Sequence, residues 1–99
     1  MDWMLVKEWL ESHGHISPNW DCIGVASNSF YAEDKMENTF ISLFTRGGDE
    51  LVAIVGMKHP KVSVGGATDA TIRSIEDVIY FLEDNLEDMY DALMRKAVL

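Results

Sequence analysis

The chain has 99 residues, of which 17 are acidic and 8 are basic, and its formal net charge is −9 at pH 7. This length fits one domain with one hydrophobic core, and a hydrophobic fraction of 47% is too high for a disordered acidic tail. The charge argues against direct binding to nucleic acid or to anionic lipid, because both need an excess of Lys and Arg.

Cysteine usage and the N-terminal sequence indicate a cytoplasmic protein. Cys22 is the single cysteine and cannot form a disulfide within the chain, so we interpret it as a small buried hydrophobic side chain. The first residues lack the basic and apolar regions of a signal peptide. No apolar run approaches the ~20 residues of a membrane span. We therefore expect a cytoplasmic protein without membrane contact.

The segment from Trp3 to His13 predicts an amphipathic helix. Asp2 suits the N-cap position, and Gly14 suits the position just after the C-terminus. Trp20 lies in the loop that follows, where it is either a lid over the core or an exposed anchor. The apolar face of the helix comprises Trp3, Leu5, Val6, Trp9 and Leu10.

The middle of the chain, from Cys22 to about Val64, has the pattern of strands. A weak strand is expected over 23–31, stronger strands over 38–45 and 51–57, and a short edge strand over 61–64. A two-residue turn at Gly47-Gly48 would place Arg46 opposite Asp49 and Phe44 opposite Leu51. Both faces of this hairpin are apolar, so the second sheet face needs either the first helix or another subunit as cover.

The C-terminal part has the clearest pattern. Residues 65–68 read as a loop, and Ser74-Ile75-Glu76-Asp77 resembles a capping box. Apolar residues then recur at helical spacing from Ile75 to Leu93, and Asn85 leaves open whether they form one long helix or two short ones. The expected class is α+β, with an N-terminal helix, an antiparallel meander of three or four strands, and a C-terminal acidic amphipathic helix or helix pair packed on the sheet.

Most of the negative charge falls on one side of this C-terminal helix. The 18 residues from Ser74 to Asp91 contain seven acids and no base, which is −7 of the total −9. On a helical wheel the acids lie within about 140° of one another, with Tyr80 in the middle and Phe81 on the flank. Glu83, Glu87 and Asp91 are ~6 Å apart along the axis, which is of the order of the phosphate spacing along a nucleic-acid strand.

This side of the helix is the candidate partner-binding surface, because aromatic anchors within a polar rim are typical of binding hot spots. The alternative is a solvated face that only keeps the protein soluble. The candidate residues are Glu76, Asp77, Tyr80, Glu83, Asp84, Glu87, Asp88 and Asp91.

The sequence contains no enzyme signature. His13 and His15 lie close together, but a metal site needs further ligands, and neither Cys-x-x-Cys nor His-Glu-x-x-His spacing occurs. Both imidazoles instead suit the negative end of the first helix. Residues 64–68 contain glycines but lack the Gly-Lys-Ser/Thr ending of a phosphate loop. We expect no catalytic residues, no metal and no cofactor.

In size, acidity, lack of enzyme motifs and the carboxylate-rich helix from Glu76 to Asp91, the chain resembles small phage-encoded inhibitors of bacterial defence, the anti-CRISPR and anti-restriction proteins. The resemblance covers the overall profile and includes no aligned motif, so it transfers no binding residues. It implies a non-enzymatic inhibitor that blocks a basic, nucleic-acid-binding surface of a larger protein, although some members act allosterically or make their target dimerise. Two other classes stay open: an immunity or antitoxin protein that neutralises a basic toxin, and a homodimeric structural or adaptor module.

Overall fold

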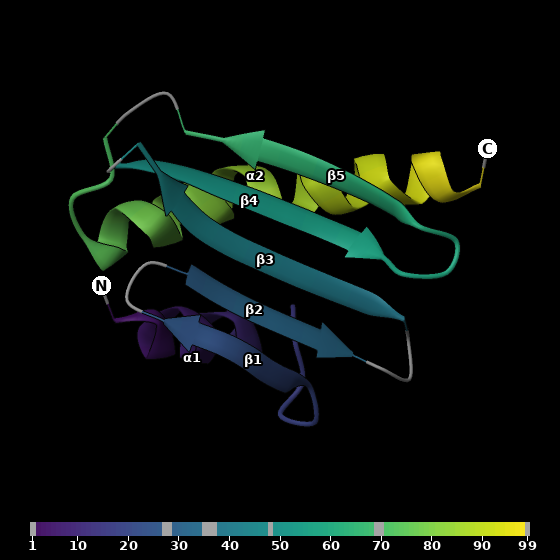
Figure 1. Cartoon of the computed structure of the whole chain (residues 1–99), viewed down its shortest axis with the longest axis horizontal. Helices are drawn as coiled ribbons and strands as arrows, with labels where there is room; N and C mark the ends of the chain where they lie inside the picture. Colours follow the sequence, from purple (N-terminus) through teal and green to yellow (C-terminus); the bar gives the residue numbers. More distant parts are fainter. Residues whose placement is uncertain (1, 27–28, 35–37, 48, 69–70, 99) are drawn as a thin grey trace.

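The computed structural model describes residues 2–26, 29–34, 38–47, 49–68 and 71–98, with the backbone alone for 22–26. The interpretation of the Cys22 side chain therefore lies outside the described residues. Two helices flank five strands along the chain (Figure 1). The elements are α1 (Trp3–Ser12), β1 (Asp21–Ala26), β2 (Ser29–Asp34), β3 (Thr39–Arg46), β4 (Glu50–Met57), β5 (Val62–Ala67) and α2 (Ile75–Ala97).

The strands form one antiparallel sheet in the order β1-β2-β3-β4-β5, so each strand pairs with its neighbours in the chain. The α+β class, the meander and the C-terminal helix packed on the sheet are confirmed. The sheet has one strand more than the upper end of the expected range, because the weak strand expected over 23–31 is two strands. Ala26 pairs with Ser29, so the chain reverses direction between them.

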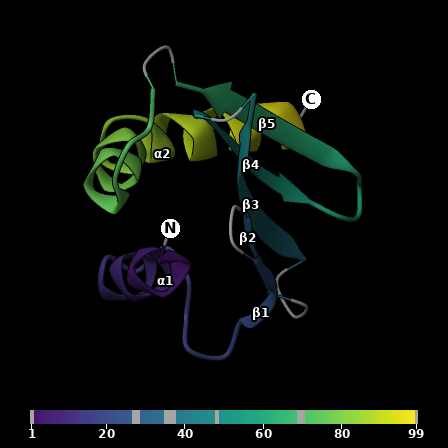
Figure 2. The ribbon, with the colours of Figure 1, turned by 60° about the vertical axis from the view of Figure 1, so that its left-hand side comes forward.

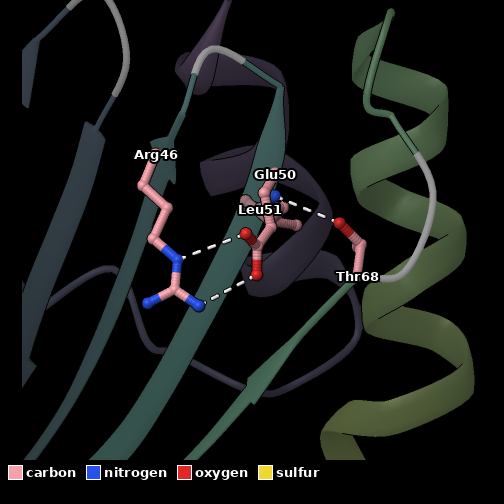
Figure 3. Close-up of polar contacts among 4 residues, drawn as sticks. All are labelled: Arg46, Glu50, Leu51 and Thr68. Atoms are coloured by element: carbon pink, nitrogen blue, oxygen red, sulfur yellow. Dashed lines mark hydrogen bonds and ion pairs between the residues drawn. The ribbon is translucent and has the colours of Figure 1, made fainter.

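The hairpin of β3 and β4 has a register one residue away from the predicted one. Arg46 pairs with Glu50, and Phe44 pairs with Val52, so the prediction that Arg46 faces Asp49 is wrong. The longer connection lets the Arg46 guanidinium bind both carboxylate oxygens of Glu50, at 3.0 and 3.3 Å (Figure 3). These hydrogen bonds lower the pKa of the Glu50 carboxyl. A shift of one residue exchanges the two faces of a strand, so Leu51 shares the core side of the hairpin with Leu43, whereas the prediction placed it opposite Phe44.

Strand β5 extends through the glycines that were expected to form a loop. Its register with β4 runs without interruption from Val62 opposite Met57 to Ala67 opposite Val52. The backbone of Leu51 continues this pairing, because its N–H donates to the Thr68 hydroxyl at 3.1 Å and its carbonyl accepts from Thr68 N–H (Figure 3). A full-length neighbouring strand thus outweighs the low strand propensity of Gly65 and Gly66.

Both helices lie on the same side of the sheet (Figure 2). Of the two covers expected for the second sheet face, the first helix or another subunit, the first helix is therefore excluded, since α1 packs beside α2. Helix α1 has its expected cap, with the Asp2 side chain accepting from Met4 N–H, but Leu5 is 43% exposed instead of buried. The core between helices and sheet includes Trp3, Val6, Leu10, Phe30, Ile41, Leu43, Leu51, Val55, Val78, Leu82, Leu86 and Leu93.

The opposite face of the sheet is not covered by any described element (Figure 2). Because side chains alternate along a strand, the residues between the core-facing positions point to this side. We call the central set the open face; it comprises Tyr31, Phe40, Ser42, Phe44, Val52 and Ile54.

Candidate functional site

The acidic surface is built on one unbroken helix. The Ser74 hydroxyl accepts from Asp77 N–H at 3.4 Å and caps the N-terminus of the helix. The Asp77 carboxylate accepts in return from Arg73 N–H at 3.0 Å, just before the helix begins. Asn85 does not divide the helix, because its side-chain amide donates to the Phe81 carbonyl at 2.9 Å within the helix. Of the two alternatives left open by the sequence, the single long helix is the one that forms. The regular spacing of Glu83, Glu87 and Asp91 therefore holds over the whole surface.

Seven of the eight candidate partner-binding residues are exposed on this helix. Tyr80 is 62% exposed, in line with its position in the middle of the acids. Asp77 is the exception: it is half-buried and its carboxylate serves the helix cap. We call the seven acids with Tyr80 the acidic face; its exposed acids are Glu76, Glu83, Asp84, Glu87, Asp88 and Asp91.

None of these exposed acids forms an ion pair with another described residue. The ion pairs found in the described ranges lie elsewhere: Lys7 with Glu11 on α1, Arg46 with Glu50, and Lys58 with Glu33. Near the end of α2, Lys96 donates to the Ser63 carbonyl of β5 at 3.1 Å and does not pair with these acids. The exposed carboxylates of the acidic face are thus available for contacts outside the chain.

A groove runs along α2 between the helix and the end of β5. It consists of two adjoining hollows of about 360 and 230 Å³, which share Ala67, Phe81 and Asn85 as lining residues. Its apolar lining comes from Phe81, Ile72 and Met89. The acidic face forms one wall, with lining residues Asp77, Tyr80 and Asp88. The surface therefore combines carboxylates with a concave apolar strip.

Several groove residues were not among the predicted site residues. Asn85 and Ala92 follow Phe81 at helical spacing, on the same side of the helix as the predicted Asp88, so this stripe on α2 was detectable from the sequence. The opposite wall of the groove, which includes Gly65 and Gly66, was not detectable, because these glycines were expected in a loop. Thr68, Thr71 and Ile72 reach the groove only because the chain after β5 returns past Asp49, whose carbonyl accepts from Ile72 N–H at 2.9 Å.

The two neighbouring histidines form part of an aromatic stack at the junction of the helices. Trp9 stacks on His13 and His15, with ring centroids at 4.4 and 5.5 Å, and His15 stacks on Tyr90 of α2 at 6.0 Å. Burial lowers the pKa of His15, helped by the nearby His13 and opposed by Glu87. Burial also raises the pKa of Tyr90 to about 12. Within the described ranges, no three His, Cys, Asp or Glu side chains are grouped so as to hold a metal ion.

Trp20 is partly buried and packs against the core. Of the two alternatives for this residue, a lid over the core or an exposed anchor, the structure therefore supports the lid.

Among the described residues, no helix combines the length and apolarity needed to cross a bilayer. Comparisons of this chain with protein-family models, with curated proteins and with solved structures find no significant match.

Proposed function

We propose that this protein is a non-enzymatic inhibitor that binds a larger protein through the acidic face of α2 and covers a basic, nucleic-acid-binding surface. The observation that carries the proposal is the row of exposed carboxylates on one continuous helix, none of which is neutralised by another described residue. Such a row is complementary to a surface that otherwise holds phosphates.

The arrangement of the acids costs stability within the free protein. Glu83 and Glu87, Asp84 and Asp88, and Glu87 and Asp91 are each four residues apart on the helix, and each like-charge pair destabilises a helix by roughly 0.2–0.5 kcal/mol. A face that serves only for solubility gains nothing from this alignment, because the same acids spread over the whole surface would give the same net charge without the repulsive pairs. When the acidic face binds a basic surface, attraction between the carboxylates and the partner's cations offsets the repulsion among the carboxylates.

The groove beside the acidic face allows this surface to discriminate between binding partners. Tyr80 stands at the rim with its ring exposed, and apolar lining residues lie beside it. Charge complementarity accelerates the encounter, whereas a buried aromatic or aliphatic contact supplies most of the binding energy at typical interfaces. We expect a partner residue with a long apolar stem and a cationic end, Arg or Lys, to enter the groove.

The test uses two double variants that change the net charge by the same amount. Glu83→Lys with Glu87→Lys alters the acidic face, whereas Glu8→Lys with Asp49→Lys alters exposed acids elsewhere. Immobilised wild-type protein is used to capture partners from a bacterial lysate, and a captured protein is then purified for titration. We expect the first variant to lose binding by at least tenfold and the second to bind like the wild type.

Two further measurements complete this test. Affinity for the captured protein should fall steeply between about 0.05 and about 0.5 M NaCl, and duplex DNA or RNA should compete with the inhibitor. Equal binding by both double variants, or affinity that does not respond to salt, would mean that the acidic face only solubilises the protein.

A further inference from the structure

The open face of the sheet has the composition of an interior, although nothing in the described chain covers it. Tyr31, Phe40, Phe44, Val52 and Ile54 form an apolar band across β2, β3 and β4, with Ser42 at its centre. An antiparallel sheet with one face in water normally alternates apolar with polar side chains, whereas β3 and β4 carry mostly apolar side chains on both faces. Contiguous apolar surface of this kind marks an interaction site.

Three side chains of this band, those of Tyr31, Phe40 and Val52, are held in place before any partner binds. The rings of Tyr31 and Phe40 stack with centroids 6.0 Å apart. The Phe40 ring also lies directly over Gly56, where an added Cβ would come within 2.6 Å of two ring carbons. Val52 is only 9% exposed. Little rotamer freedom is left to lose on docking, which lowers the entropic cost of association.

The charged side chains at the two ends of the band form ion pairs with one another. Arg46 and Glu50 pair at one end of the sheet, and at the other end the Lys58 ammonium reaches the buried carboxylate of Glu33, which also accepts from the Tyr31 hydroxyl. In Figure 3 the Arg46–Glu50 pair lies in front of the strands, on the side away from α1. Asp21, which pairs with Glu33 in the sheet, and Lys61, which lines a hollow together with Phe40, add one charge of each sign beside the open face. The described charges around the open face therefore sum to zero.

From these observations we infer that the open face binds a second copy of this chain, so that two sheets pack face to face around a two-fold axis. A two-fold interface brings the same surface against itself, and any net charge on it would be opposed by its own sign. The open face meets this condition, whereas the acidic face does not.

The position of the acidic face also favours this dimer. Helix α2 lies on the other side of the sheet, so two joined sheets would hold the two α2 helices on opposite outer surfaces (Figure 2). With about 10 Å between the sheets and about 10 Å for each helix layer, the two helices are roughly 30 Å apart. Because the Debye length is about 8 Å at physiological ionic strength, repulsion between the two helices is screened.

The open face belongs to a sheet whose size is close to that of a small specific interface. All five strands together, about 4.8 Å apart and each about seven residues long, give a face of roughly 500 Å² in plan, with the open face at its centre, and standing side chains increase the accessible area. Specific interfaces begin at about 600 Å² per partner. Edge-to-edge pairing through β5 is less favourable, because Lys96 already binds the Ser63 carbonyl and places a cation on that strand.

The test is the mass of the wild-type chain in solution, measured by sedimentation equilibrium from about 1 to about 500 μM, the range in which small interfaces associate. We expect the mass to rise from 11.2 kDa to twice that value. A monomer at every concentration would overturn the inference, even if another protein were found to bind the open face. The dimer should persist at about 1 M NaCl, where binding through the acidic face is lost, so the two proposals fail separately.

Two variants locate the interface. Ser42→Asp places a charge in the middle of the open face without removing an apolar group, and we expect at least a tenfold weaker dimer. Ile54→Lys tests the same face through an apolar position. Met94→Lys, which changes a 59% exposed residue of α2, is the control and should dimerise like the wild type. If a dimer forms equally well in Ser42→Asp and Met94→Lys, it uses another surface and the inference is wrong.

Discussion

Gly56 and Gly65 are both strand glycines, but their surroundings predict opposite effects of the same substitution. An added Cβ at Gly56 would lie 2.6 Å from the Phe40 ring and 2.8 Å from the Val62 carbonyl oxygen. At Gly65 the nearest atoms are 3.7 Å away, which is ordinary contact. We expect Gly56→Ala to destabilise the protein by about 1–3 kcal/mol through overpacking.

Gly65→Ala should be neutral or stabilising by up to about 1 kcal/mol, because alanine restricts the unfolded chain. Urea unfolding of the two variants and the wild type at one protein concentration measures the difference. Similar midpoints for both variants would show that Phe40 does not pack over Gly56 as described. This contrast was not accessible from the sequence, which placed Gly56 in a strand and Gly65 in a loop and does not show which atoms an added Cβ would meet.

At the scale of elements, the helices were more predictable than the strands. Each helix carries its own start signal and a continuous apolar stripe, as Asp2 and Ser74 illustrate. Strand register instead depends on the length of the connection between strands, and one additional residue after Arg46 was enough to change it. Likewise, Gly65 and Gly66 join the sheet because β4 offers a complete row of partners, which is information held in another part of the chain.

The junction between the two helices should respond to pH. His15 lies between Trp9 and Tyr90, where burial and His13 lower the pKa of its imidazole below the usual 6.5, against the opposing effect of Glu87. The neutral ring is thus the form that the folded state favours. Its stabilising contribution is fully present above the unfolded pKa and is lost as the pH falls through the folded pKa, because the unfolded chain binds the proton more readily.

We therefore expect the urea midpoint of the wild type to decrease between about pH 7 and about pH 5, and to decrease less in His15→Gln. The exposed His59 provides the control, since His59→Gln should follow the wild-type curve. Parallel curves for the wild type and His15→Gln would show that His15 is not the group whose protonation weakens the helix junction.

At the scale of the whole molecule, the sequence indicated which surfaces matter but not how they are arranged. The concentration of seven acids on one side of α2 followed from helical periodicity alone, and so did the exposure of Tyr80. The side of the sheet occupied by α1 did not follow, because an apolar helix face fits either side of a sheet with two apolar faces. With both helices on one side, the acidic face and the open face lie on opposite surfaces of the protein (Figure 2). One molecule can therefore use both at once.

This arrangement implies that the acidic face reduces the stability of the free protein, and Glu87 is the residue with which to measure the effect. Glu83 precedes it by four residues and Asp91 follows by four, so Glu87→Lys changes two repulsive pairs into attractive ones. We expect the variant to gain about 1 kcal/mol, or roughly 5 °C in Tm for a domain of this size. Glu87→Gln, which only removes the repulsion, should gain about half as much. The differences should shrink at about 1 M NaCl, where the Debye length is about 3 Å. If thermal unfolding at low salt shows Glu87→Lys to be no more stable than the wild type, the aligned acids cost the fold nothing, and the stability argument for a binding role of the acidic face is lost.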